Sequence, residues 1–209
     1  MALTKSVASV DDWTSVALAS MAEGATVDLS ACYDAMLHIV HALAGTTAHL
    51  GTEIIVQVSA NTTGDEDWVD LCRFVAGVKT AFKSDFAADE AVGQTVLSVT
   101  NPATGNLDHL FKWILLLDAT VVNSEIAYLI AQSGDAGDTI TVQDAITVAK
   151  TSANSDVYTC DGAGVSAVDI FNVQLPASIN RCRVLYNNGY GATGSTVLVS
   201  CRISKVTAL

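Results

Sequence analysis

Proline, basic side chains and long apolar runs are all scarce in this chain of 209 residues. It contains two prolines and no low-complexity tract, so the sequence predicts no flexible linker. No apolar stretch approaches the roughly 20 residues that cross a bilayer. The run from Trp113 to Leu117 has only the size of a core strand. We therefore expect a folded protein with no membrane partner.

Basic residues are outnumbered by acidic ones. Lys and Arg together number 10, against 22 Asp and Glu, which gives a formal net charge of −12. Such a charge repels the phosphate backbone that dominates nucleic-acid affinity, so nucleic acid is not an expected partner. It also keeps copies of an abundant protein soluble. The first residues, Met-Ala-Leu-Thr-Lys, lack the pattern of a secretory signal, so we expect synthesis and folding in the cytoplasm.

The signatures of common catalytic and cofactor sites are missing as well. The sequence has no Gly-x-Ser-x-Gly elbow, no phosphate-binding Gly-rich loop, no dinucleotide fingerprint and no His-Glu-x-x-His pair. His38 and His41 would point to opposite faces of a strand. The acidic runs at 65–67 and 135–138 do not match an EF-hand calcium loop. We expect no catalytic residue, no cofactor and no metal.

What the sequence has instead is a series of short β-branched segments separated by turns. Residues 52–59 and 68–74 predict a hairpin or a sheet corner, and residues 36–43 predict a buried strand. Residues 181–186 and 195–206 alternate apolar and polar side chains on either side of a Gly-rich stretch, which predicts a long hairpin. Further segments predict a single helical turn at 85–91 and strands at 94–99, 108–117, 125–131, 139–142 and 169–175.

Many short strands at roughly even spacing predict an all-β fold, a β-sandwich or jelly roll. The residue pattern changes after Asn101-Pro102, which indicates a small inserted β subdomain. We expect residues 1–100 plus 157–209 to form the sandwich core domain and residues 101–156 to form the inserted subdomain.

Three segments carry a resemblance to a known class of protein. They read Gly-Thr-Glu-Ile-Ile-Val-Gln-Val-Ser at 51–59, Asp-Trp-Val-Asp-Leu at 67–71, and Arg-Cys-Arg-Val-Leu-Tyr-Asn-Asn at 181–188 leading to Arg-Ile-Ser-Lys-Val at 202–206. In these segments the chain resembles structural proteins of tailed bacteriophages, and the resemblance covers both ends better than the middle. It implies a non-enzymatic virion protein, above all a jelly-roll head decoration (cement) protein that stabilises the capsid through contacts between subunits. The implied partners are further copies of itself, as a homo-oligomer, and the major capsid protein or other virion proteins.

The Asn- and Gly-rich stretch at 187–194 is the candidate contact surface. Its tyrosine has no strand face to bury it, which makes it suitable as an interface anchor. Residues 1–10 are largely apolar and carry one charge, Lys5, and they form either an arm that reaches a neighbouring copy or a disordered end. The candidate interface residues are Asn187, Asn188, Tyr190 and Thr193.

The five cysteines show no zinc-type spacing. In a protein folded in the cytoplasm we expect buried thiols, whereas in a virion exposed to an oxidising medium they could join copies through disulfides. The odd count leaves at least one thiol free or paired between chains. Cys182 and Cys201 would face each other in a hairpin around Gly191, so an intrachain bridge is a third possibility. The disulfide candidates are Cys32, Cys72, Cys160, Cys182 and Cys201.

Three other functions stay open. A neck or tail protein would act in the same way at another place on the virion. A glycan-binding sandwich would use exposed aromatic side chains such as those of the three tryptophans. A glycosidase would need carboxylates that converge only in the fold, such as Asp67 with Asp70 or Asp108 with Asp118.

Overall fold

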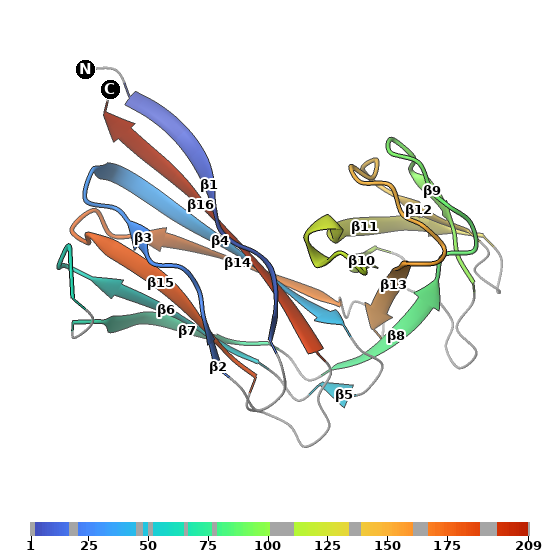
Figure 1. Ribbon diagram of the computed structural model, residues 1–209, viewed down its shortest axis with the longest axis horizontal. Helices are drawn as coiled ribbons and strands as arrows, with labels where there is room; N and C mark the ends of the chain where they lie inside the picture. The colour runs from blue at the N-terminus through green and yellow to red at the C-terminus, as the bar shows by residue number, and fades with distance from the viewer. Residues whose placement is uncertain are drawn as a thin grey trace.

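A computed structural model describes residues 3–16, 21–44, 48–49, 52–64, 67–76, 79–100, 111–133, 139–160, 167–188 and 196–208. Within these ranges the regular secondary structure is β-strand, apart from one short 3-10 turn, η1 (Val121–Asn123), and there is no α-helix. Figure 1 shows a two-layered sandwich beside a smaller, rolled sheet. The start of β1 and the end of β16 lie side by side, at the end of the sandwich far from the smaller sheet.

Two antiparallel sheets form the sandwich. In the described part of the chain the first sheet has the order β1 (Leu3–Val16), β16 (Thr196–Ala208), β4 (Cys32–Ala44) and β14 (Val168–Leu175). The second sheet has the order β2 (Met21–Glu23), β15 (Arg181–Asn187), β6 (Glu53–Ser59) and β7 (Val69–Val75), and β3 (Val27–Asp28) also pairs with β15.

The strand order is that of a long hairpin rolled over on itself. The outermost strands β1 and β16 pair with each other, then β2 with β15, β4 with β14, and β6 with β7, and successive pairs alternate between the two sheets. This is the topology of a jelly roll. The prediction of an all-β jelly roll is confirmed.

Alternation along each strand builds the core between the sheets. Leu37 and Ile39 of β4 and Ile203 of β16 face Val56 and Val184 of the second sheet, and all five are fully buried. Their period of two is that of a strand with one face on the core. The sequence pattern therefore fixes which side of each strand faces inward.

Local pairing agrees with several predicted elements. The hairpin expected from residues 52–59 and 68–74 is confirmed, because β6 pairs with β7. The strand expected at 36–43 lies within β4. The helical turn expected at 85–91 is wrong: Phe86 and Glu90 lie in isolated β-bridges, to Val99 and Lys150. Bridging on both residues holds this segment in an extended form.

The long hairpin expected from residues 181–186 and 195–206 is also wrong. These segments are β15 and β16, but β15 pairs with β6 and β2, whereas β16 pairs with β1 and β4 in the other sheet. Both strands alternate apolar and polar side chains because both face the same core, one from each side. Alternation thus identified the strands correctly but carried no information about their partners.

The strands of a third sheet, apart from the short β5, lie between β7 and β14 in the chain. Its order in the described residues is β5 (Ala48–His49), β8 (Lys79–Asp85), β13 (Ser155–Cys160), β10 (Lys112–Asp118), β11 (Glu125–Gln132), β12 (Thr139–Val142) and β9 (Val96–Ser98). Beyond β8, the amide of Ala87 donates to the carbonyl of Ser98 at 2.9 Å, and the amide of Thr100 donates to the carbonyl of Asp85 at 2.8 Å. These bonds join β8 to β9 and close the sheet into a small barrel.

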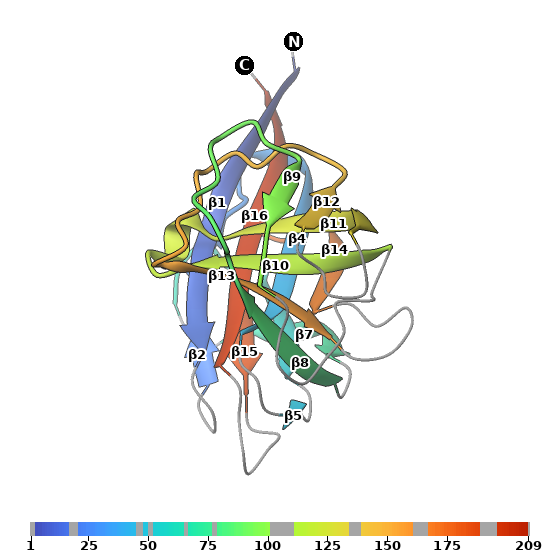
Figure 2. The same cartoon turned by 90° about the vertical axis from the view of Figure 1, so that its right-hand side faces the viewer.

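Strand β10 is buried on both faces. Ile114 and Leu116 lie in the core of the barrel, together with Leu129 and Val157. Leu115, between them, belongs to the core cluster of the sandwich, and β10 contacts β4 and β14 of the first sheet. β10 and β11 run across the direction of β1 and β16 (Figure 2). Double burial explains why the run from Trp113 to Leu117 is apolar without alternation.

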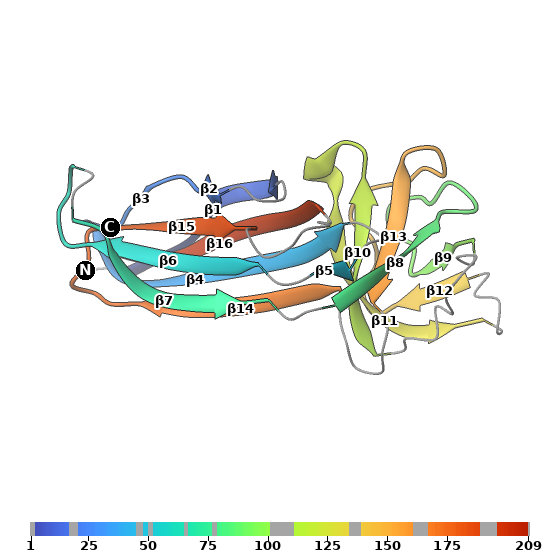
Figure 3. The same ribbon diagram turned by 90° about the horizontal axis from the view of Figure 1, so that it is seen from below.

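The barrel begins earlier in the chain than the subdomain expected at 101–156. β8 and β9 precede residue 101, yet they pair with β13 and β12. Figure 3 shows the resulting barrel beyond one end of the sandwich. The division into domains 1–100 plus 157–209 and 101–156 stays a prediction. We propose that the inserted unit runs from β8 to β13, residues 79–160.

Replacing Leu129 with Ala tests whether the barrel is a cooperative unit of its own. Leu129 is fully buried in the barrel core, so we expect L129A to lower the free energy of unfolding of the barrel by about 2–5 kcal/mol. Hydrogen exchange should speed up in β10–β12 and stay slow in β6 and β15.

The matched control is I130A, the next residue on β11, whose side chain is partly exposed. It should change the stability by roughly 0.5 kcal/mol or less. Equal loss of protection in the sandwich strands of L129A would show instead that barrel and sandwich unfold together.

Candidate functional site

The predicted contact loop begins in described residues and continues outside them. Asn187 ends β15, and its amide donates to Glu53 Oε2 at 3.4 Å. Asn188 is 1% exposed, and its Oδ1 accepts a hydrogen bond from Thr52 Oγ1 at 3.2 Å. The side chain of Asn188 therefore ties β15 to the start of β6 instead of lying on the surface. Tyr190 and Thr193 lie outside the described residues, so their contact role stays a prediction.

The cysteines divide by burial. Cys182 and Cys201 are free thiols, fully buried and on opposite sheets, so no shared hairpin places them opposite each other. The intrachain bridge, one of the three possibilities, stays a prediction. Burial raises the pKa of Cys182 to about 12 and raises that of Cys201 even more strongly. Cys32 and Cys72 are free and partly buried, and the side chain of Cys160 lies outside the described residues. Disulfides between copies stay a prediction for these three.

The histidines take part in hydrogen bonds on opposite faces of β4, as their spacing predicted. His38 Nδ1 is 2.7 Å from Asn172 Oδ1, and its Nε2 is 3.2 Å from Ser204 Oγ. His41 is buried, with Nδ1 3.3 Å from Asp169 Oδ2. Among the described residues no group of three His, Cys, Asp or Glu side chains is placed to hold a metal ion.

The outer face of the second sheet is a network of paired charges. Arg73 contacts both Glu53, at 2.8 Å, and Asp70, at 2.5 Å. The amide of Gln57 donates to Asp70 Oδ1 at 2.8 Å. The hydrogen bond from Gln57, with that from Arg73, lowers the pKa of Asp70. Asp70 therefore serves the network and is not a free carboxylate for catalysis.

The same network continues onto β15. Arg183 donates to Gln57 Oε1 at 2.8 Å and to Glu23 Oε1 at 2.5 Å. The ring of Trp68 covers the guanidinium groups of Arg183 and Arg181, at 4.3 and 4.8 Å from its centroid. Cation–π contact uses the face of this tryptophan that a sugar would need. The second sheet thus presents water with a network of polar groups that are satisfied within the chain, beside the exposed side chain of Val75.

The outer face of the first sheet is different. At the barrel end, Ala42, Val168 and Leu198 lie side by side in register and are buried where β10 contacts β4 and β14. Away from the barrel, Val7 of β1 and Ile170 of β14 are 64% and 40% exposed. The barrel therefore covers one part of this face, and the rest exposes Val7 and Ile170 on the two edge strands, with polar side chains such as His38 and Arg202 between them.

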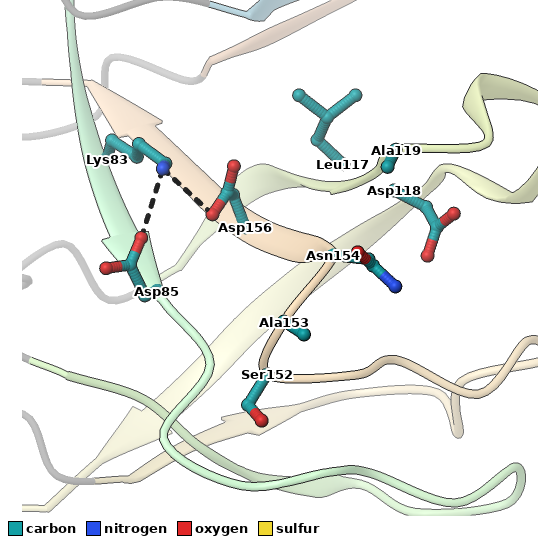
Figure 4. Close-up of a pocket in the computed structure, with 9 residues that line it drawn as sticks. All are labelled: Lys83, Asp85, Leu117, Asp118, Ala119, Ser152, Ala153, Asn154 and Asp156. Atoms are coloured by element: carbon teal, nitrogen blue, oxygen red, sulfur yellow. Dashed lines mark ion pairs between the residues drawn. The ribbon is translucent and has the colours of Figure 1, made fainter.

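An open cleft of about 400 Å³ lies at the edge of the barrel (Figure 4). The Lys83 ammonium lies between the carboxylates of Asp85, at 3.1 Å, and Asp156, at 3.0 Å. The hydrogen bond from Lys83 lowers the pKa of Asp85, whereas burial raises the pKa of Asp156. Asp118, on the opposite wall, accepts from Ser155 Oγ at 2.9 Å. Polar groups that satisfy one another line this cleft, in contrast to the apolar walls of most ligand sites.

A second hollow, of about 140 Å³, has aromatic walls. The rings of Trp113 and Tyr128 meet edge to face with centroids 5.2 Å apart, and Asp144 and Thr147 stand at the rim. Ligand sites usually enclose about 300–1,000 Å³, so this hollow admits only part of a ligand. It is the one aromatic surface among the described residues that we retain for glycan binding.

No protein-family model matches the chain, and neither does any curated protein. Among solved structures, VP17, a capsid protein of bacteriophage P23-77, aligns over 100% of this chain and 98% of its own, with 8% identity and a TM-score of 0.20. A structure of infectious bursal disease virus, Gt strain, aligns over 98% of this chain and 80% of its own, with 11% identity and a TM-score of 0.23. At such TM-scores these likenesses carry no argument, and the fold assignment rests on strand order. No helix in the described ranges is long and apolar enough to span a membrane.

Thiol labelling tests the division of the cysteines. In the native protein we expect iodoacetamide to modify Cys32 and Cys72 but not Cys182 or Cys201, because burial excludes the reagent and keeps the thiols protonated. Peptide mapping by mass spectrometry reads each site. All four should react after denaturation, and labelling of native Cys182 at the rate of Cys32 would contradict the buried position.

Proposed function

We propose that this protein is a non-enzymatic structural component of a bacteriophage particle, specifically a decoration protein that stabilises the head through contacts between subunits. The observation that carries the proposal is the contrast between the two outer faces of the sandwich. The outer face of the second sheet carries charges paired with one another, beside the exposed Val75, and no other sheet packs on it in the described residues. The outer face of the first sheet packs against the barrel, and beyond the barrel it exposes Val7 and Ile170 among polar side chains such as Asn172.

That contrast suits a protein held on a lattice by one face. Desolvating a surface of paired charges is unfavourable, because the charges lose their hydration. Burying exposed apolar side chains is favourable. The first-sheet face is therefore the side for a neighbouring subunit, and the second-sheet face is the side for solvent. A standard contact buries roughly 800 Å² per partner, about one twelfth of the 9629 Å² surface of this chain.

The fold is compatible with this role, though jelly rolls also serve lectins and cupins. The choice among these functions rests on the surfaces. In the described residues the polar cleft is occupied by its own ion pairs, and the aromatic hollow is small. The outer faces of the sandwich are therefore better suited to contact with another protein than the cleft or the hollow is to binding a ligand.

Reconstitution with phage heads tests the proposal. Purified protein is mixed with heads that lack it, the heads are pelleted, and bound protein is quantified against the major capsid protein. We expect saturable binding at a fixed ratio. I170K, on the first-sheet face, should weaken binding at least tenfold, because it places a charge in an apolar contact.

The matched control is V75K, which also replaces an exposed apolar residue with Lys. Val75 lies on the edge strand of the second sheet and is 64% exposed. It should bind as the wild type does, and equal losses in both variants would contradict the assignment of faces. Binding to isolated necks or tails but not heads would favour the neck or tail alternative. Glycan binding that changes tryptophan fluorescence and is lost in Y128A would favour the lectin alternative.

A further inference from the structure

Three of the four strand edges of the sandwich carry features that discourage the addition of another strand. On the second sheet, β7 has a register shift and exposed charges, and β2 and β3 are short. On the first sheet, β14 runs into Pro176. Its polar side chains are held by the neighbouring strand, with Asn172 bonded to His38 and Gln174 bonded to Asp34.

The remaining edge, β1, has only one of these features over its first half, the exposed charge of Lys5. Leu3 to Ser9 pairs with β16 without a register shift, and the irregularities begin only at Asp11. The segment contains no proline and a single charge, Lys5. Leu3 and Val7 are both 64% exposed. Long, regular and apolar edges of this kind pair readily with another strand.

Asp11 explains why the regular stretch ends where it does. Its carboxylate accepts a hydrogen bond from the buried hydroxyl of Tyr186 at 3.2 Å, across the space between the sheets. Burial raises the pKa of Asp11. The register shift at this residue thus accompanies a hydrogen bond into the interior. Leu3 to Ser9 pairs regularly, without such a shift.

Both faces of the segment are open as well. Ser6 and Ala8, which point toward the second sheet, are exposed, because β2 and β3 are too short to cover them. Lys5 and Val7 lie on the outer face, which continues into the surface that the barrel already covers. A partner on this edge would extend the first sheet and the apolar face together.

We propose that β1 is the contact between two copies of this chain, which pair antiparallel through Leu3 to Ser9 about a twofold axis near Ser6. The occupant is a strand because only a strand satisfies a row of backbone donors and acceptors. It is a second copy because the segment is self-complementary. Pairing about Ser6 sets Leu3 opposite Ser9, and Lys5 opposite Val7, with no like charges directly opposed.

Charge supports the same choice. Copies with a net charge of −12 repel each other, but this segment carries none of the acidic residues. The cations beside it are engaged: Arg202 pairs with Asp12, and Lys205 donates to the carbonyl of Asp28 at 2.9 Å. Two copies therefore meet here with less repulsion than along the acidic surfaces.

The pairing closes on itself. A twofold contact uses the β1 edge of both copies, so β1 is not left open to a third copy. The edges left at the ends of the joined sheet are the two β14 strands, whose polar side chains Asn172 and Gln174 are bonded to β4. The inference rests on the proposed function for its biological role, because it supplies the repeating unit of the decoration.

Cysteine substitution on the strand tests the pairing and its register in purified protein. About a twofold axis at Ser6, the two Cα atoms of residue 6 are about 4.5 or 5.5 Å apart, within disulfide range. We expect S6C to form a covalent dimer on mild oxidation. S9C is the matched control, since its two copies lie about 20 Å apart along the strands and should remain unlinked, as should the wild type.

A charge on the edge tests the energetics. Size-exclusion chromatography with light scattering should give a dimer for the wild type, and V7K should raise its dissociation constant at least tenfold. V122K, at an exposed valine of η1, should dimerise as the wild type does. Unchanged thermal unfolding of V7K would exclude misfolding as the cause.

A wild-type monomer at all concentrations would overturn the inference, as would an undiminished V7K dimer or cross-linking of S9C as fast as S6C. These results are separable from the capsid role. A dimer that does not bind heads would overturn only the proposed function, and a monomer that decorates heads would overturn only the β1 pairing.

Discussion

The double burial of β10 is the constraint on which the arrangement of this protein depends. A strand with one face in each of two cores joins them rigidly, because its backbone cannot shift toward one core without opening the other. Ile114 and Leu116 serve the barrel, and Leu115 serves the sandwich. The closure of the barrel through β8 and β9 then leaves a compact body on one part of the first sheet, and the asymmetry of the molecule follows from that placement.

The polarity of each outer face of the sandwich depends on whether the barrel packs against it. Where β10 contacts the first sheet, outward residues such as Ala42 and Leu198 are small or apolar because they form an internal contact. The second sheet has no such cover among the described residues, and its outward residues include Arg73, Glu53 and their partners as well as the exposed Val75. The uncovered part of the first sheet exposes Val7 and Ile170 among polar side chains, next to a region that already packs against the barrel. A surface of that intermediate kind is what an association between subunits requires.

Sequence reasoning predicted the strands well and their partners poorly. The alternation in β15 and β16 depends on a core that lies on one side of each strand, which is a local property. Their assignment to different sheets depends on pairings such as Leu3 with Ala208, which join residues at opposite ends of the chain. The same limit explains the start of the barrel. β8 and β9 look like any other short strands, and only their closure by hydrogen bonds places them with β10. The neighbouring Asn and Gly residues predict a loop position for Asn188. No local sequence pattern indicates that its side-chain amide is buried against Thr52.

The rolled hairpin also determines what is left free. Its outermost pair is β1 and β16, and β1 is the edge strand of the first sheet in the described chain. An insertion between β7 and β14 enters near the opposite end of the hairpin, so the barrel grows at the far end of the sandwich (Figure 1). The barrel therefore enlarges one end without covering Leu3 to Ser9. One topology thus accounts for both the body that covers part of the first sheet and the strand that stays available to a second copy.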